Sequence, residues 1–330
     1  MSGLPNVTVL SAGGTIAMTG AGGAGVLPKL GADDLVNAVP ALARIANVRS
    51  RSLFSLPSPH MEIGTVVRIT EAIDEEFAGG ADGVVVTQGS DTIQESAFAL
   101  DLLLDPARPV AVTGAMRNPS LPGHDGPANL FSAVSAVANP AIAGQGVVVV
   151  MDDMIHAARH VHKAHTTRVG AFSSDPILLG QLAEGRLILH ARLSPLPRID
   201  RRAVMQPANV ALLQGSMGDH GEFVDTVLSC GYQGLIVEGM GGGHVHPAMA
   251  DRLEKLAAQV PVIFASRTRG GTTLQGTYAY AGGELDLIRR GLIRAGWLHA
   301  LKARILLSLL LGQGADMKEI RRFFTAFDGG

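Results

Sequence analysis

Residues 7–20 read Val-Thr-Val-Leu-Ser-Ala-Gly-Gly-Thr-Ile-Ala-Met-Thr-Gly and join a β-prone run to a glycine turn. The first four residues predict a short strand, and Gly13 and Gly14 allow a tight turn that presents the hydroxyl of Thr15. Ligands bind at the carboxyl ends of strands in open α/β sheets, so Thr15 is either a nucleophile or a ligand-binding hydroxyl. Taken alone, the stretch favours a simpler interpretation, in which the threonine only caps the backbone after the turn.

The composition predicts a soluble globular protein of about two domains. The chain has 330 residues, of which 47% are hydrophobic, and its charges are interspersed. The formal net charge of -2 leaves no basic field for a phosphate backbone, so nucleic acid is not an expected partner. The most apolar stretch, 297–311, contains charged residues and is too short to span a bilayer. Its spacing predicts an amphipathic helix packed on a core.

The chain carries a single cysteine, Cys230, which cannot form an intrachain disulfide and fits a reducing compartment. The N-terminus, Met-Ser-Gly-Leu-Pro-Asn, lacks a basic start followed by a long apolar run. These features predict a cytoplasmic protein without a signal peptide or a membrane segment.

Strand and helix patterns alternate after the first strand. The expected strands are 48–56, 82–88, 110–114 and 147–151, and the expected helices are 33–46, 62–77, 93–104 and 127–138. This alternation predicts a parallel, doubly wound sheet with right-handed crossovers. The carboxyl ends of its first strands therefore meet at one crevice.

Hydroxyl-bearing residues follow two more of these strands. Ser58 lies in a proline-punctuated loop directly after the second strand. After the third strand, Gly89 opens a turn, and Ser90 or Asp91 can cap the following helix.

The glycine-rich segment 19–31 is expected to be a mobile loop over Thr15. It contains a formal G-x-G-x-x-G motif at 20–25. A dinucleotide site requires such glycines to follow a strand directly and to open a helix, whereas the first strand ends about ten residues earlier. The motif is therefore not expected to bind a dinucleotide.

Four histidines lie within ten residues, at His156, His160, His162 and His165. His156 and His160 have the i, i+4 spacing that places two zinc ligands on one face of a helix. Because neither a cysteine nor an H-E-x-x-H motif accompanies them, we expect no metal. Lys163 is either a solvated surface lysine or a lysine that lies beside Asp91.

Residues 191–207 contain three prolines and four arginines and are expected to form an exposed linker. The linker separates an N-terminal α/β domain, 1–190, from a smaller C-terminal α/β domain, 208–330. The second domain has expected strands at 210–213, 234–238 and 262–265, a glycine turn at 239–243 and a helix at 247–259.

Several motifs together resemble the bacterial-type L-asparaginase (asparaginase/glutaminase) family. They are Ala-Gly-Gly-Thr-Ile-Ala at 12–17, Thr-Gln-Gly-Ser-Asp-Thr-Ile-Gln-Glu-Ser-Ala at 87–97, Thr-Gly-Ala-Met-Arg at 113–117 and His156 with Lys163. Asp125-Gly126-x-x-Asn129, the 239–243 turn and Lys302-Ala-Arg304 extend the similarity over nearly the whole chain. The resemblance implies a large N-terminal and a small C-terminal α/β domain, usually in a homotetramer of two intimate dimers, and hydrolysis of a small amide without a cofactor.

The resemblance also implies roles for individual residues. Thr15 would be the nucleophile on the side-chain amide carbon, and Ser90, Asp91 and Lys163 would form a second hydroxyl, acid and lysine set. The residues that it places at the substrate are Gly14, Ser58, Pro59, Gly89, Ser90, Asp91, Ala115 and His244. Among these, Ser58 and Asp91 would hold the substrate's α-carboxylate and α-amino groups, and Ala115 would offer its carbonyl to the leaving amide.

The chemistry fits these roles. A threonine hydroxyl is a poor nucleophile near neutral pH and needs a positioned base to take its proton. Lys163 can be that base only if it is neutral, which the sequence leaves open. Backbone N–H groups in the two glycine turns can stabilise the oxyanion.

The chain departs from the family pattern at several positions. Ser90 replaces a threonine and keeps its hydroxyl, Pro59 replaces a glutamine, and His244 replaces an asparagine. The family's mobile N-terminal loop carries a tyrosine that helps to activate the nucleophile, and this lid tyrosine is absent here. The acidic residue usual in the segment 269–280 is missing as well. Tyr278 or Tyr280 is expected to replace the lid tyrosine, unless both are ordinary core or interface aromatics.

Two functions of different classes remain after the motifs are weighed. The first is an amidohydrolase of the asparaginase type, acting on L-asparagine or a close small amide, with an amidase for a different small amide, without the usual α-amino recognition, as its alternative. The second is a substrate-binding pseudoenzyme that kept the crevice and lost the lid chemistry. Release of ammonia from asparagine distinguishes them, and a dehydrogenase is the weakest candidate.

Overall fold

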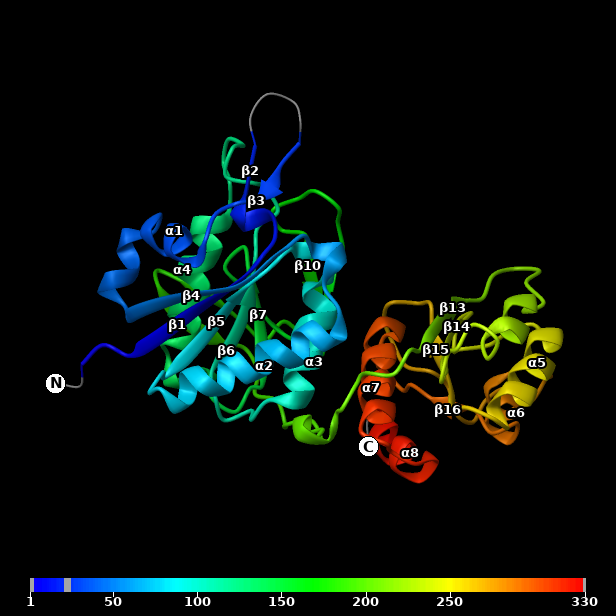
Figure 1. The fold of residues 1–330 in the computed structure, drawn as a ribbon. Coiled ribbons are helices and arrows are strands. Elements are labelled where there is room, and N and C mark those ends of the chain that lie inside the picture. Colours follow the sequence, from blue (N-terminus) through cyan, green and yellow to red (C-terminus); the bar gives the residue numbers. More distant parts are fainter. Residues whose placement is uncertain (1–2, 21–24, 329–330) are drawn as a thin grey trace. The chain divides into compact units, whose positions relative to one another are not determined.

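The computed structural model describes residues 3–20 and 25–328, and the chain forms two compact units, Met1–Arg198 and Ile199–Gly330 (Figure 1). The division between the units falls inside the proline- and arginine-rich segment 191–207. Both units combine helices with sheets. Among the described residues, no helix has both the length and the hydropathy needed to cross a bilayer.

The first unit is built on an eight-stranded sheet with the order β12-β11-β8-β7-β6-β5-β1-β4. Its strands are β1 (Asn6–Gly13), β4 (Asn47–Leu56), β5 (Gly83–Thr87), β6 (Val110–Thr113), β7 (Val147–Met151), β8 (Met154–Ala157), β11 (Gly180–Ala183) and β12 (Arg186–Leu189). The strands from β4 to β7 are parallel, and β8, β11 and β12 extend the sheet by antiparallel pairing. The predicted α/β class with a mostly parallel, doubly wound sheet is confirmed.

Helices cover both faces of this sheet. Helices α2 (Ile63–Ala78) and α3 (Ile93–Leu103) pack together on one face, and α1 (Ala32–Asn37) and α4 (Gly126–Val137) lie on the other (Figure 1). Strands β5 and β7 are valine-rich and buried along their whole length, because parallel strands between two helical layers expose neither face to water.

Short 3-10 helices complete the connections. They are η1 (Thr15–Ala17), η2 (Pro40–Arg44), η3 (Ser58–His60), η4 (Ser90–Thr92), η5 (Pro140–Ile142), η6 (Arg201–Ala203) and η7 (Glu222–Thr226). Three of them, η1, η3 and η4, follow directly after β1, β4 and β5.

Three expectations about the first unit need correction. The single helix expected at 33–46 is interrupted, because Pro40 cannot continue α1 and instead begins η2. The glycine-rich loop at 19–31 is in part a hairpin, in which β2 (Met18–Thr19) pairs with β3 (Leu27–Pro28). Residues 21–24, which carry most of the G-x-G-x-x-G motif, lie outside the described residues.

The third correction concerns the histidine segment, which is not helical. It folds as β8, β9 (Val161–Lys163) and β10 (Phe172–Ser174), with β9 and β10 antiparallel. The i, i+4 interpretation of His156 and His160 is therefore wrong, since these residues do not share a helix face.

The second unit contains a four-stranded parallel sheet in chain order, β13-β14-β15-β16. Its strands are β13 (Ala211–Gln214), β14 (Leu235–Gly239), β15 (Val262–Ser266) and β16 (Ile293–Arg294), and its helices are α5 (Pro247–Ala257), α6 (Glu284–Arg289), α7 (Ala300–Gly312) and α8 (Met317–Thr325). Helix α7 begins three residues after Trp297 and buries most of its residues, including Lys302. The amphipathic helix expected at 297–311 is thus a shorter helix, and most of its residues are buried.

Candidate active site

The carboxyl ends of four neighbouring strands lie at one edge of the large sheet. Strands β4, β1, β5 and β6 are adjacent and parallel, so the segments that follow Leu56, Gly13, Thr87 and Thr113 emerge side by side. This edge carries every site residue that the sequence assigns to the first domain, apart from Lys163 on β9.

Two glycines allow the turns at this edge to touch. Gly14 has a φ of 84°, in the left-handed region that favours glycine, and a Cβ on it would lie 2.0 Å from the amide nitrogen of Gly89. A Cβ on Gly89 would in turn lie 2.6 Å from the Cβ of Ser58. No side chain fits at either glycine, so the backbones that carry Thr15, Ser90 and Ser58 are in direct contact.

Thr15 begins η1 and is partly exposed. Within residues 3–20 and 25–328 its hydroxyl has no hydrogen-bond partner, so it does not cap the turn as the simpler interpretation proposed. The next residue, Ile16, is buried against the start of α4, where a Cβ on Gly126 would lie 2.9 Å from Ile16 Cγ1. Packing of Ile16 therefore fixes the turn and leaves the Thr15 hydroxyl available.

Ser90, Asp91 and Lys163 form a hydrogen-bonded set. Lys163 Nζ donates to Ser90 Oγ at 2.9 Å and to Asp91 Oδ1 at 2.5 Å. The Lys163 side chain is only 15% exposed, which excludes the solvated surface lysine, whereas Asp91 is 61% exposed. Gln94, on α3, accepts the backbone N–H of Lys163 at 2.9 Å and so fixes β9 beside the set.

Ser58, rather than Ser90 or Asp91, caps the helix that follows β5. Its buried hydroxyl accepts the N–H groups of Asp91 at 2.8 Å and Thr92 at 3.2 Å. The cap expected from Ser90 or Asp91 is therefore wrong, because these two side chains contact Lys163 instead. Pro59 follows Ser58 in η3 with its side chain exposed.

The loop after β6 is anchored by two buried residues, Asp125 at the N-cap of α4 and Asn129 within α4. Asp125 accepts the N–H of Met116 at 2.9 Å and the N–H of Arg117 at 2.8 Å. Asn129 donates to the carbonyl of Gly114 at 3.0 Å and to Asp125 Oδ2 at 3.0 Å. Ala115 lies between these anchored groups and is fully buried. The sequence offers Asp125 and Asn129 only as part of a motif, and their positioning role needs the folded loop to be seen.

The histidines of the first unit are distributed among separate contacts. His156 Nδ1 lies 2.8 Å from Ser174 Oγ. His165 Nδ1 accepts the N–H groups of Thr167 and Arg168. The described part of the chain contains no group of three histidine, cysteine, aspartate or glutamate side chains that could hold a metal ion.

His244, Tyr278 and Tyr280 form a cluster of their own in the second unit, around a residue that the sequence analysis missed. His244 Nε2 lies 3.0 Å from Glu284 Oε2, and the Tyr280 hydroxyl lies 2.8 Å from His244 Nδ1. The ring of Tyr278 packs edge-on to His244 at 5.2 Å between centroids. A neutral imidazole with its proton on Nε2 satisfies both bonds, because it donates to the carboxylate and accepts from the phenol.

Glu284 lies just beyond segment 269–280 and binds the backbone of that segment. It is fully buried, and its Oε1 accepts the N–H groups of Thr277 at 2.6 Å and Tyr278 at 2.7 Å. Burial alone would raise its pKa, but the N–H groups of Tyr278 and Thr277 hold the pKa of Glu284 below its ordinary value. Burial, followed by the charge of Glu284, raises the pKa of Tyr280.

The chain is similar to known proteins along most of its length. Residues 6–194 match the family model for the asparaginase N-terminal domain, and residues 209–324 match that for the glutaminase/asparaginase C-terminal domain. The chain is 37% identical over 326 residues to a probable L-asparaginase of Deinococcus radiodurans, with 98% of each chain covered. It is 34% identical to a probable periplasmic L-asparaginase of Haemophilus influenzae, covering 98% of this chain and 93% of the relative.

A solved structure shares the fold. The probable cytoplasmic L-asparaginase of Campylobacter jejuni superposes with a TM-score of 0.87 at 30% identity, covering 97% of this chain and 99% of that one. Two family models that together span most of the sequence, and relatives that cover it almost end to end, establish that the chain belongs to the asparaginase family.

Proposed function

We propose that the protein is an amidohydrolase that hydrolyses the side-chain amide of L-asparagine, or of a close small amide, to the acid and ammonia. One observation carries the proposal: the available Thr15 hydroxyl lies on a backbone that touches the backbone carrying Ser90, and Lys163 binds the side chains of both Ser90 and Asp91. Relatives named L-asparaginases over nearly the whole chain support the same activity.

Thr15 acts as the nucleophile in this proposal. Its oxygen bonds to the amide carbon as its proton leaves, and collapse of the tetrahedral intermediate expels ammonia once the nitrogen has received a proton. Water then hydrolyses the resulting ester and restores the hydroxyl. Ser90, Asp91 and Lys163 handle these protons as one hydrogen-bonded unit, because each is bonded to another member of the set.

Neighbouring groups at the same sheet edge bind the substrate. The N–H groups of the Gly14 and Gly89 turns supply donors for the developing oxyanion. Ser58 and Asp91 hold the α-carboxylate and α-amino groups, with Pro59 beside them, and the Ala115 carbonyl accepts from the leaving amide. Anchoring of the Ala115 loop by Asp125 supports this last role.

Tyr280 takes the place of the missing lid tyrosine, supplied by the second unit of a neighbouring copy in a dimer or tetramer. Its hydroxyl is held by His244, and His244 by Glu284, whereas Tyr278 contacts His244 through its ring. We place the protein in the cytoplasm, consistent with its single cysteine and with the cytoplasmic structural relative.

Ammonia release from L-asparagine by the wild type and by Thr15→Val tests the function. Valine replaces a hydroxyl with a methyl at nearly equal volume, so the variant should fold, bind asparagine and fail to turn it over. Melting curves and calorimetric binding control for misfolding. Turnover by a pure Thr15→Val protein would remove the nucleophile assignment. Binding without turnover by the wild type would favour the pseudoenzyme, and turnover of other small amides alone would favour a different amidase.

A further inference from the structure

The Asp125 carboxylate binds the loop after β6 and not the helix that Asp125 begins. Aspartate is a preferred N-cap residue, because its side chain usually accepts an N–H group of the first helical turn. Asp125 is the N-cap of α4, yet its side chain accepts none of these groups. Its oxygens instead accept the N–H of Met116, at 2.9 and 3.1 Å, and the N–H of Arg117, at 2.8 Å. The carboxylate therefore holds the loop in one position.

The bond to Met116 also sets the direction of the Ala115 carbonyl. The C=O of Ala115 and the N–H of Met116 belong to one planar trans peptide unit, in which they point in opposite directions. Because the N–H points at the Asp125 carboxylate, the Ala115 carbonyl points away from Asp125 and from the start of α4. Asp125 thus controls the orientation of this carbonyl without touching its oxygen.

Asn129 holds the Asp125 carboxylate in place. Its NH2 group donates to Asp125 Oδ2 and to the carbonyl of Gly114, both at 3.0 Å, and its Oδ1 accepts the N–H of Asp152 at 2.9 Å. Asn129 and Asp125 are both buried, so water does not compete for these bonds. The carboxylate is therefore fixed relative to the ends of β6 and β7, which lie directly before Gly114 and Asp152.

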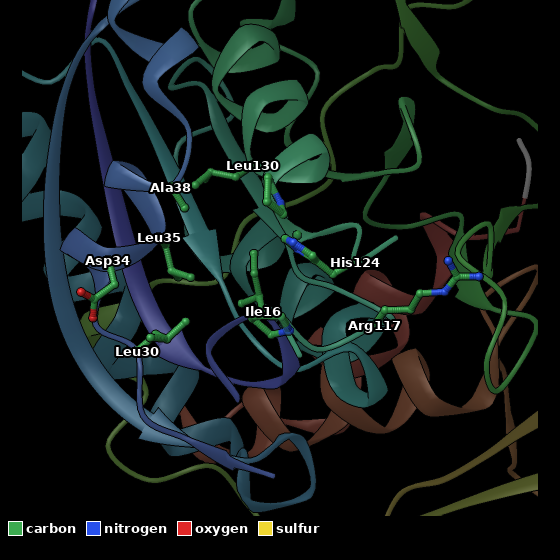
Figure 2. Close-up of a pocket in the computed structure, with 11 residues that line it drawn as sticks. Ile16, Leu30, Asp34, Leu35, Ala38, Arg117, His124 and Leu130 are labelled. Carbon is green, nitrogen blue, oxygen red and sulfur yellow. The ribbon is translucent and has the colours of Figure 1, made fainter. Parts of the chain in front are cut away.

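Ala115 lies beside the turn that carries Thr15. A Cβ on Gly126 would lie 2.9 Å from Ile16 Cγ1 and 3.6 Å from the Cβ of Ala115, so both side chains pack against the first residue of α4. Ile16 also lines a largely apolar pocket, in which the Arg117 side chain extends away from it (Figure 2). The loop after β6 therefore brings backbone groups, and not a charged side chain, to the turn.

We propose that Asp125 is the positioning residue that makes the site selective for amides over esters. The inference rests on the proposed function, in which the Ala115 carbonyl accepts an N–H of the leaving amide. An ester has no N–H at that position, so its oxygen and the carbonyl face each other as two acceptors. The carbonyl distinguishes the two leaving groups only while it is held in one direction. The bond strengthens as the nitrogen gains a proton and leaves, so the selectivity acts on kcat/KM.

Hydrolysis of L-asparagine and of the β-methyl ester of L-aspartate tests the inference, because the two substrates differ only in the leaving group. Asp125→Ser keeps an N-cap side chain but is too short to bind both N–H groups of the loop. The ratio of kcat/KM for the amide over the ester should fall about ten- to a hundredfold in this variant. An unchanged ratio would overturn the inference, even if both activities fell together.

Asp125→Asn is the conservative variant. It keeps the shape of the side chain and one accepting oxygen, so the amide-to-ester ratio should fall less than in Asp125→Ser. If Asp125→Ser does not fold, an undiminished ratio in Asp125→Asn would overturn the inference.

Asp101→Asn is the matched control. Asp101 is also a buried aspartate that accepts a backbone N–H, that of Val147 at 2.8 Å, but Val147 begins β7 and so lies at the opposite end of the sheet from the site. This variant should lose stability, measured as melting temperature, and keep the amide-to-ester ratio of the wild type. A fall in the ratio as large as that in Asp125→Asn would overturn the inference, because loss of stability alone would then explain both.

Binding to a Thr15→Val protein separates this inference from the proposed function. Calorimetry on this variant measures the affinity for the amide and for the ester without turnover. Added Asp125→Ser should weaken the amide about two- to tenfold and leave the ester unchanged. Equal weakening of both ligands would overturn the inference. Failure of the wild type to hydrolyse either substrate would overturn only the proposed function, whereas binding of neither ligand would overturn both.

Discussion

The backbone of Gly14 rests on the backbone of Gly89, so closely that a Cβ on Gly14 would be 2.0 Å from the Gly89 amide nitrogen. This contact joins the end of β1 to the end of β5 and therefore joins the turn of Thr15 to that of Ser90. It is a contact between main chains, so the relative position of the two hydroxyls does not depend on flexible side chains. Substitution of Gly14 should disturb both turns at once.

Gly14→Ala is expected to destabilise the protein more than Gly80→Ala and to reduce turnover. Both glycines have a positive φ, 84° and 89°, but the space around a Cβ on Gly80 is open. The left-handed conformation alone costs about 1–2 kcal/mol, so the excess loss in Gly14→Ala measures the contact with Gly89. Urea denaturation of both variants checks this, and equal losses would contradict it.

Lys163→Met and Asp91→Asn should each lower kcat by roughly 10²–10⁴, because the two residues and Ser90 form one hydrogen-bonded proton-handling set. Ser90→Thr should remain active, since it keeps the hydroxyl. Ammonia release is the measurement, and Lys255→Met, at an exposed position on α5, is the matched control. An active Lys163→Met enzyme would show that the proton leaves by another route.

Tyr280→Phe should lose most turnover without losing stability, because the Tyr280 hydroxyl is bonded to His244 Nδ1. Tyr278→Phe is the control, since Tyr278 contacts His244 through its ring, which phenylalanine keeps. Turnover and melting temperature of both variants check the prediction. Equal turnover in the two variants would assign both tyrosines to packing.

Stability should depend on Glu284 in a pH-sensitive way. Its folded-state pKa is lowered, so the ionised carboxylate stabilises the fold above its ordinary pKa of 4.5 and this contribution is lost as pH falls through the lowered value. The stability difference between the wild type and Glu284→Gln should therefore be largest near pH 7 and shrink towards about pH 3. Urea denaturation across this range measures it, and a difference that grows on acidification would contradict the direction of the shift.

Recognition of the α-amino group should be weak. The family resemblance places a glutamine where this chain has Pro59 and an acidic residue in 269–280, where this chain has none. Under the proposed function, Asp91 is then left to bind the ammonium. Each hydrogen bond to a charged group contributes about 1.5–3 kcal/mol. Loss of two such bonds should therefore reduce the preference for L-asparagine over an amide without the amino group by about two to four orders of magnitude. The ratio of kcat/KM for L-asparagine over its des-amino analogue succinamate should lie below about 10⁴. A larger ratio would mean that His60 or His244 has rebuilt the ammonium site.

The sequence by itself determined the α/β class, the first strands and the turns at their ends. Strand β5 and the glycine turn after it are examples, because a buried valine run and the need for a small residue in a tight turn are local properties. Predictions from such local patterns were wrong at the helix expected over 33–46 and in the His156 segment. Pro40 divided an expected helix, and the His156 segment, which has helical histidine spacing, became strand β8, which pairs with β7 directly before it and with β11.

Only the tertiary structure decided which groups meet. Lys163 reaches Asp91 across 72 residues, and Ser58 caps a helix 33 residues further along the chain, because strand order places β9 beside α3 and β4 beside β1. Glu284 likewise lies 40 residues along the chain from His244, and only folding brings its carboxylate to the imidazole. Hydrogen bonds of this kind depend on strand order, register and turn geometry, and the periodicity of a single segment contains none of these.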